Sequence, residues 1–309
     1  MNRFRAFAAL LLLPLVMLPP SAFAWGNEGH RMINRLAAEK LPAEVPAFLR
    51  TPAAVSEIEY LGPEPDRWRG RLEPELVNAQ APDHFMDMEV ADVVKPLPHT
   101  RYEFIADLYK AAAAAPDRAR ELAPERVGFQ PWQTTEVYER LVIAFREWRN
   151  ETAAKADTKP VEATIIFYAG WLGHYVGDGS QPLHTTIQYN GWVSKENPNG
   201  YTTGHQIHWQ FEGPFVGANA KHDEVAAKMT ETKKISGDIF DSYLAYLRTT
   251  NSFVEKTYQL EKNNGYIGTG NAESRAFMTE RLAAGASELR DMIYTAWLQS
   301  ATPEPAAKY

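Results

Sequence analysis

The chain has 309 residues, of which 45% are hydrophobic and 23% charged, and this composition excludes disordered, collagenous and multi-pass membrane architectures. It contains no Cys, so disulfides and thiolate metal sites are excluded, and any bound metal needs His, Asp, Glu or backbone ligands. The formal net charge of -7 argues against a protein that neutralises many phosphates of duplex nucleic acid with a basic face.

The first 24 residues have the pattern of a secretory signal peptide. Two early arginines precede an apolar run from Phe7 to Leu18, and small residues stand at Ala22 and Ala24, as at a signal-peptidase cleavage site. A transmembrane anchor is the alternative, but the run is short and interrupted by proline, which disfavours a span. We therefore predict cleavage after Ala24, Trp25 as the mature N-terminus, a periplasmic or secreted protein, and no stable membrane insertion.

The remaining chain has the pattern of helices joined by polar loops. Apolar residues recur at helical spacing in residues 32–37, 104–112, 137–148 and 277–298. Residues 160–178 begin with proline and are apolar on nearly all sides, which indicates a helix at the centre of a bundle. No stretch alternates with a period of two, and residues 63–74 and 190–204 have the composition of loops. The sequence predicts an all-α fold, a single-domain multi-helix bundle over residues 25–300 with a flexible tail at 301–309.

Two histidines are each followed four residues later by an acid: His174 by Asp178, and His208 by Glu212. Residues four apart share one face of a helix, and zinc accepts imidazole nitrogen and carboxylate oxygen together. Either pair alone is more often an ordinary surface contact. Two such pairs with His184 between them favour a shared metal cluster.

Three further segments carry groups of the same kind. Cleavage before Trp25 would expose an α-amino group, which ligates metal once deprotonated, and His30 follows five residues later. Asp66 stands three residues before Arg69, and His84 is followed by an aromatic residue and two acids. Each segment alone is more often structural, as a solvated charge run or a core histidine with its hydrogen bonds made.

In chain order these segments resemble one family. The pattern is Trp-Gly-x-x-Gly-His from Trp25, a loop aspartate, His-Phe-x-Asp from His84, His-x3-Asp-x5-His from His174, and a final His-x3-acid pair. It resembles the trinuclear zinc phosphodiesterases, which comprise the single-strand-specific nucleases of the S1/P1 type and, in the same superfamily, bacterial zinc phospholipases C. The resemblance spans Trp25 to Glu212 and implies an almost entirely α-helical fold with a trinuclear zinc cleft.

The resemblance assigns ligands for three zinc ions. One zinc would bind Asp66, His84, His174 and Asp178. A second would bind His184, His208 and Glu212. The third would bind the amino group and carbonyl oxygen of Trp25, together with His30 and a bridging oxygen of Asp178.

The resemblance also implies catalytic and substrate-binding roles. The close zinc pair would activate water near neutral pH, and Asp66 would orient or deprotonate that water. Arg69 would hold phosphate oxygens as charge builds in the transition state. Phe85 would stack on a base while Asp87 hydrogen-bonds its edge, which explains a preference for unpaired strands because a base inside a duplex has no free face. Plain core packing is the alternative for Phe85.

Several details separate the nucleases from the phospholipases. The short spacing from Trp25 to His30 and the long gap from His184 to His208 are similar to the nucleases. Glu212 is similar to the phospholipases, because the nucleases more often have Asp at this last ligand position.

Other positions depart from the nuclease pattern. Gly213 replaces the Asn that usually follows the last acid, and residues 201–204 replace the Gly-Gly-Asn loop. His205 is either a substitute polar contact or a competitor of the nearby ligand histidine. His99 and His222 fit no ligand position, and we expect both on the surface.

We therefore expect a trinuclear zinc phosphodiesterase, an endonuclease that hydrolyses single-stranded DNA and RNA to 5'-phosphate products, with 3'-nucleotidase activity as a further expectation. The alternatives are a zinc phospholipase C acting on phosphocholine-type head groups and a non-catalytic zinc-binding helical module. Structural zinc sites are closed, whereas this pattern implies positions open to water, which favours an enzyme. Single-stranded nucleic acid or a nucleotide is the expected partner, and no protein partner is implied.

Overall fold

The computed structural model describes residues 25–70 and 72–303. The predicted signal peptide and most of the predicted tail at 301–309 lie outside the described residues. Within the described ranges the regular secondary structure is helical, apart from an isolated bridge between Tyr189 and Gly191. This confirms the predicted all-α fold. None of the helices in these ranges has the length and hydrophobicity of a bilayer span.

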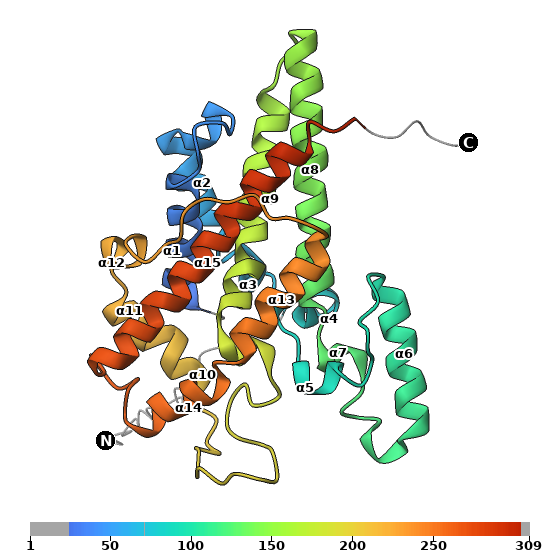
Figure 1. Ribbon diagram of the computed structural model, residues 1–309, viewed down its shortest axis with the longest axis vertical. Coiled ribbons are helices and arrows are strands. Elements are labelled where there is room, and N and C mark those ends of the chain that lie inside the picture. Colours follow the sequence, from blue (N-terminus) through green and yellow to red (C-terminus); the bar gives the residue numbers. More distant parts are fainter. Residues whose placement is uncertain (1–24, 71, 304–309) are drawn as a thin grey trace, which may run out of the picture.

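Helix α9 (Lys159–Ser180) forms the centre of the bundle. It packs against α1 (Gly26–Glu39), α2 (Pro52–Leu61), α8 (Gln130–Ala154) and α15 (Ala272–Gln299). In Figure 1, α8 runs beside α9, α15 crosses α9 diagonally, and α1 and α2 lie on the other side. The second half of α9, from residue 172 onward, is completely buried, as expected for a helix that is apolar on nearly all sides.

Shorter helices complete the fold. They are α3 (Glu64–Arg67), α4 (Pro74–Gln80), α5 (Met88–Ala91), α6 (Arg101–Ala114), α7 (Pro124–Val127), α10 (Ile207–Gln210), the π-helix η5 (Phe211–Phe215), α11 (Val216–Asn219), α12 (His222–Ala226), α13 (Ile239–Asn251) and α14 (Val254–Lys262). Single turns of 3-10 helix occur at η1 (Ala47–Arg50), η2 (Ala81–His84), η3 (Pro116–Arg118) and η4 (Pro182–Thr185).

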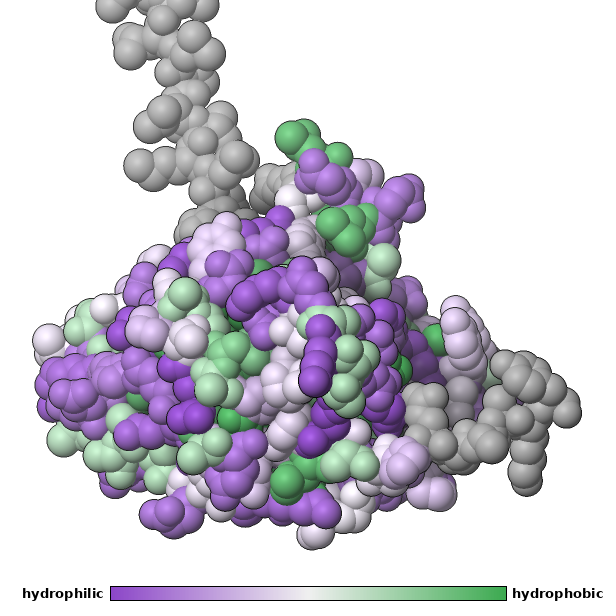
Figure 2. Space-filling view, turned by 90° about the horizontal axis from the view of Figure 1, so that it is seen from above, coloured by the Kyte–Doolittle hydropathy of each residue, from purple (hydrophilic) through white to green (hydrophobic). Residues whose placement is uncertain are grey.

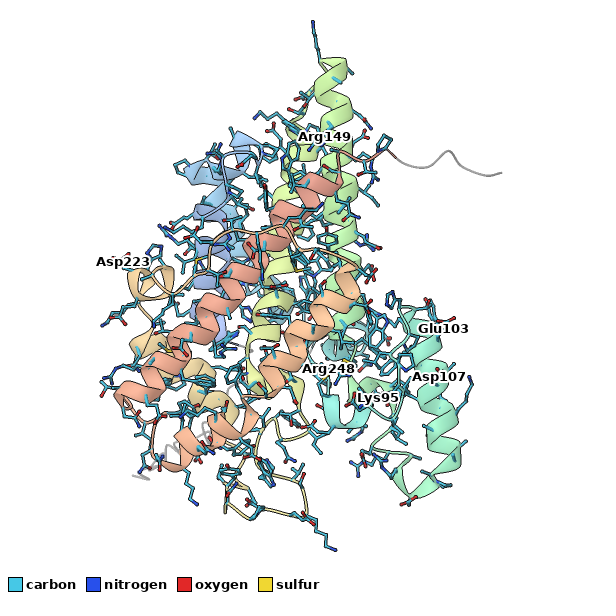
Figure 3. The ribbon with its side chains drawn as sticks, viewed as in Figure 1. Lys95, Glu103, Asp107, Arg149, Asp223 and Arg248 are labelled. Atoms are coloured by element: carbon cyan, nitrogen blue, oxygen red, sulfur yellow. The ribbon has the colours of Figure 1, made fainter. Side chains whose placement is uncertain are left out.

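Helices α5, α6 and α7 form a lobe beside the bundle (Figure 1). Arg248 of α13 and Lys95, which follows α5, both form ion pairs with Asp92, at 2.7 and 2.9 Å. Figure 3 shows Arg248 and Lys95 close together where α13 meets the lobe. The pair with Arg248 joins α13 to the lobe, whereas the pair with Lys95 lies within the lobe, and such partly exposed pairs each contribute little to the free energy of unfolding.

Local signals account for the starts of the two longest predicted helices. Pro160 lies in the first turn of α9, where its fixed φ suits a helix start. Helix α15 begins earlier than the predicted residue 277, because Asn271 and Ser274 form a reciprocal capping box that satisfies two backbone N–H groups.

The loop predictions are correct in one segment and wrong in part of the other. Residues 190–204 contain no regular element beyond the isolated bridge. Residues 63–74 contain α3, which has proline in its first turn. Proline in a polar segment such as residues 63–74 indicates a loop, but it also favours the start of a short helix.

Three glycines, Gly170, Gly173 and Gly177, line one face of α9 and allow α1 and α2 to approach it closely. A Cβ on Gly173 would overlap the side chain of Asn34 on α1, and one on Gly177 would lie 3.0 Å from Nδ1 of His30. Asn34 is fully buried and donates hydrogen bonds to the carbonyl oxygens of Ile58 and Gly170, at 2.8 and 2.9 Å. This single amide therefore joins α1, α2 and α9.

One face of the molecule is mostly polar. Figure 2 shows a face on which hydrophilic side chains predominate and hydrophobic ones are scattered in small groups. This pattern agrees with the net charge of -7 and with an apolar core gathered around α9, α1 and α15.

Gly173→Ala is expected to lower the free energy of unfolding by about 1–3 kcal/mol, the usual cost of overpacking a filled core. The reason is that the added methyl group overlaps Asn34 and Leu289. Urea denaturation followed by circular dichroism measures the change. Gly217→Ala is the control, because a Cβ on this helical glycine meets no atom within 4 Å. Equal stability of the two variants would contradict the close approach of α1 to α9.

Candidate metal centre

The predicted ligand residues come from seven elements that meet at the carboxyl end of α9. They are Trp25 before α1, His30 on α1, Asp66 on α3, His84 in η2, His174 and Asp178 on α9, His184 in η4, His208 on α10 and Glu212 in η5. All of them are buried. Eight contribute side chains to three groups whose nitrogen and oxygen atoms lie within 4.8 Å of one another: His30, His174 and Asp178; Asp66, His84 and His174; and His184, His208 and Glu212.

Asp178 stands between the first two groups. One of its oxygens lies 3.3 Å from Nε2 of His30. The other lies 3.2 Å from Nδ1 of His84 and 3.3 Å from Nε2 of His174. Asp66 completes this part, with an oxygen 3.9 Å from Nδ1 of His84. The carboxylate of Asp178 thus faces two groups at once, which is the geometry of a bridging ligand.

Hydrogen bonds to the far nitrogen of each ring orient the histidines. Nδ1 of His174 bonds to the carbonyl oxygen of Gly62 at 2.9 Å, and Nε2 of His84 bonds to Oε1 of Gln80 at 2.6 Å. These carbonyl acceptors place the proton on the bonded nitrogen. The remaining ring nitrogens then carry lone pairs, and they face each other at 2.9 Å. Two facing lone pairs repel, so a cation between them stabilises this arrangement.

His30 and Trp25 fix α1 against α9. Neither ring nitrogen of His30 has a hydrogen-bond partner, although the ring is fully buried and stacks on His174 with centroids 4.1 Å apart. The indole N–H of Trp25 donates to the carbonyl oxygen of Gly177 at 2.7 Å. This hydrogen bond holds Trp25, at the start of α1, against the residue of α9 that precedes Asp178.

The third group lies where α10 continues into the π-helix η5. Nε2 of His208 is 2.8 Å from Glu212, and Nε2 of His184 is 3.3 Å from the same carboxylate. Their Nδ1 atoms bond to the carbonyl oxygens of Tyr189 and His84, at 3.0 and 2.7 Å. Both Nε2 lone pairs therefore point to Glu212. Single π turns inside helices occur frequently at functional sites.

The chemistry of these residues fits bound metal. Buried polar atoms normally have hydrogen-bond partners, yet Oδ2 of Asp66, Oδ1 of Asp178, Nε2 of His184 and Oε2 of Glu212 have none. Each of these atoms belongs to a predicted ligand. Imidazole nitrogen and carboxylate oxygen are also the donors that zinc prefers when thiolates are absent.

The pKa shifts of the ligand histidines differ in direction. Burial is outweighed by nearby carboxylates at two of them, which raises the pKa of His174 and raises that of His184 to about 9, so metal binding at His184 would release a proton. Burial lowers the pKa of His30, and it lowers the pKa of His84 to about 4, so both rings are neutral at pH 7, as metal binding requires. Burial opposes ionisation of Asp178, but His184 and His174 hold its pKa well below the usual range. At Glu212 burial is likewise outweighed by His208 and His184, which lower the pKa to about 2.

A cavity of about 680 Å³ opens onto the ligands His84, His184 and His208. The predicted substrate residues Arg69, Phe85 and Asp87 line the same cavity. Arg69 lies 3.4 Å from Asp66, and Phe85 is only partly buried. The structure therefore brings the predicted substrate residues and the predicted ligands to one space.

Sequence reasoning missed four contributors to this site. Gln80 orients His84, and the amide of Gln181 donates to Glu212. The carbonyl groups of Gly62 and Tyr189 orient His174 and His208. Gln181 is the first residue of the segment Gln-Pro-Leu-His that ends at the ligand His184. The contacts of Gln181, Gly62 and Tyr189 are with residues distant in the sequence, whereas Gln80 lies four residues before His84.

The remaining histidines lie outside the three groups. His99 is exposed and His222 is half-exposed, as expected for surface residues. His205 is exposed and bonds to the carbonyl oxygen of Asn190 at 2.7 Å. The structure places it in none of the buried ligand groups.

The described residues form an all-α fold with buried groups of His, Asp and Glu that could hold metal ions. Residues 25–303 match the family model of the S1/P1 nuclease. The chain therefore belongs to the S1/P1 nuclease family.

No curated protein sequence matches the chain significantly. Among solved structures, Clostridium perfringens alpha-toxin isolated from an avian strain aligns with a TM-score of 0.46 and 12% sequence identity. The alignment covers 92% of this chain and 66% of the toxin chain, so this chain spans just under two thirds of the toxin's length.

Asp178→Asn is expected to lower the bound metal content by more than one ion per chain, because this carboxylate faces two ligand groups. Metal analysis after dialysis measures the stoichiometry. Asp223→Asn is the control, since Asp223 is exposed on α12 (Figure 3). Unchanged stoichiometry in Asp178→Asn would contradict the bridging role.

Proposed function

We propose that the protein is a periplasmic or secreted endonuclease that uses three zinc ions to hydrolyse single-stranded DNA and RNA, leaves 5'-phosphate products, and has 3'-nucleotidase activity. The observation that carries this proposal is that two of the three buried histidine and carboxylate groups reach one cavity, through His84, His184 and His208, and that Arg69, Phe85 and Asp87 line the same cavity. A structural zinc site would have no such opening to substrate.

The three groups would hold the zinc ions as the resemblance assigns them. Asp66, His84, His174 and Asp178 would bind one, and His184, His208 and Glu212 a second. Trp25, His30 and Asp178 would bind the third. When bound, two zinc ions that lie close together activate water and neutralise charge on the phosphoryl oxygens.

The protein's own residues position the substrate and handle the proton. Arg69 is about one third exposed at the cavity and ion-pairs with Asp66, so its guanidinium is aligned to bind phosphate oxygens bidentately. Asp66 is buried, with one oxygen that has no hydrogen-bond partner. With that oxygen bound to metal, the other oxygen, which lies 3.4 Å from Arg69, would orient or deprotonate the attacking water.

Phe85 and Asp87 would bind the base. Phe85 follows the ligand His84 directly and lines the cavity with a partly exposed ring, which suits stacking on an unpaired base. Burial raises the pKa of Asp87 to about 8, and Glu89 and Glu121 add to the effect. Near neutral pH the carboxyl group of Asp87 is therefore largely protonated and both donates and accepts hydrogen bonds.

A phospholipase C acting on phosphocholine-type head groups is the second candidate. Glu212 at the last ligand position and Gly213 after it favour this reading, because the nucleases more often have Asp followed by Asn. The partly apolar cavity lining, with Val90, Ile187 and Val193, is compatible with either substrate. A non-catalytic zinc module would leave the cavity unexplained.

The proposed cleavage before Trp25 is testable by measuring the zinc content of the protein. A variant that retains one residue before Trp25 is expected to lose one zinc ion per chain, because its amino group becomes an amide that no longer ligates. The control is the same protein processed to Trp25. Full metal content and full activity in the extended form would contradict the terminal ligand and, with it, the cleavage site.

The function is tested by product analysis. The zinc-loaded protein processed to Trp25 is incubated with a single-stranded oligonucleotide, the matching duplex and a phosphocholine diester. We expect 5'-phosphate nucleotides from the single strand, much less from the duplex, and no product after chelation. Phosphocholine as the only product would establish phospholipase C activity instead. No product from any of the substrates would favour a non-catalytic zinc-binding module.

A further inference from the structure

Tyr189 exposes a large aromatic side chain beside the metal ligands. Its side chain is 56% exposed and lines the cavity together with Asn190 and Val193. Its carbonyl oxygen accepts the hydrogen bond that orients His208, and the two rings lie 6.1 Å apart at an interplanar angle of 78°. The ring of Tyr189 is therefore held next to the third ligand group, yet it contributes no metal-binding atom.

The backbone around Tyr189 is fixed on both sides. The hydroxyl of Tyr258 accepts a hydrogen bond from the backbone N–H of Gly191 at 3.0 Å and donates to the carbonyl oxygen of Gln188. The buried side chain of Gln188 accepts from the backbone N–H of Val193 at 2.6 Å. An exposed aromatic ring on a segment anchored this firmly is preorganised for contact with a ligand.

Phe85 and Tyr189 are attached to different ligand groups. Phe85 follows His84, which belongs to the group with Asp66 and His174. Tyr189 is bonded to His208, which belongs to the group with Glu212. A phosphate held at the metal centre would lie between these groups, so the nucleosides on its two sides would extend toward two different aromatic rings.

We infer that Tyr189 is a second stacking platform, which binds the base on the opposite side of the scissile phosphate from the base at Phe85. This inference rests on the proposed nuclease function and extends it, because it makes a dinucleotide with two unpaired bases the preferred unit of recognition. Two separated rings can stack only on bases that have left a duplex, since a paired base has both faces covered.

The charges around the cavity favour a nucleotide over a lipid at this position. The lobe contributes Asp117, Arg120, Glu121, Glu125 and Arg126 to the cavity lining. A wall with this density of charge disfavours burial of acyl chains, whereas its two arginines can contact the phosphates of a nucleotide backbone. A nucleic acid base is therefore the favoured stacking partner of the Tyr189 ring.

The test uses three dinucleoside monophosphates with the zinc-loaded enzyme. One carries both bases, the second has an abasic sugar on the 5' side, and the third has an abasic sugar on the 3' side. The enzyme forms are wild type, Tyr189→Ala, Tyr189→Phe, Phe85→Ala and the control Tyr102→Ala, in which an exposed tyrosine of α6 outside the cavity lining is truncated. The measured quantity is kcat/KM for each pair.

Wild type should prefer the full dinucleotide by about tenfold over either abasic form, the order of magnitude of one stacked base. Tyr189→Ala should lose the preference against one abasic substrate and keep it against the other, and Phe85→Ala should show the opposite pattern. Tyr189→Phe, which keeps the ring, should retain the preferences of wild type, as should Tyr102→Ala.

Three results would overturn the inference. Tyr189→Ala could keep both preferences, could lower kcat/KM equally on all three substrates, or could lose the same preference as Phe85→Ala. Failure of wild type to cleave any dinucleotide or oligonucleotide would instead overturn the proposed nuclease function on which the inference rests.

Discussion

The structure depends on one buried carboxylate, that of Asp178. It lies in the fully buried second half of α9, with His30, His84 and His174 within 3.3 Å. An ionised carboxylate in such a place is costly unless opposite charge and hydrogen bonds compensate it. Each of these histidines comes from a different turn or helix, so the elements that carry them must converge on this point. Metal bound there would supply the compensation and join the same elements.

The meeting of these elements at Asp178 gives several features of the fold one common explanation. Glycines on one face of α9 admit α1, and the last of them, Gly177, leaves room for the ring of His30 beside Asp178. The widened turn of η5 carries Glu212 to His208 and His184. Backbone carbonyl groups, those of Gly62, His84 and Tyr189, fix which ring nitrogen is free. Helix packing and ligand orientation are therefore parts of one arrangement.

The sequence predicted the elements and the ligands for which a local signal exists. The apolar pattern of residues 160–178 located α9, and the spacing of His174 and Asp178 placed both on one helix face. The ring of Tyr189 was not predictable, because it acquires its role through a contact with a distant segment. The lobe residues that line the cavity, such as Arg120 and Arg126, carry no motif, and only tertiary packing brings them to the site. The start of α3 was missed because proline is a signal both for loops and for helix starts.

The central claim is that the eight side chains and Trp25 form one cluster of three zinc ions. The most direct measurement is anomalous diffraction at the zinc absorption edge from crystals of the protein processed to Trp25 and loaded with zinc. We predict three anomalous peaks: one among Asp66, His84, His174 and Asp178, one among His184, His208 and Glu212, and one beside Trp25, His30 and Asp178. A single peak, or peaks only at exposed residues such as His99, would contradict the account.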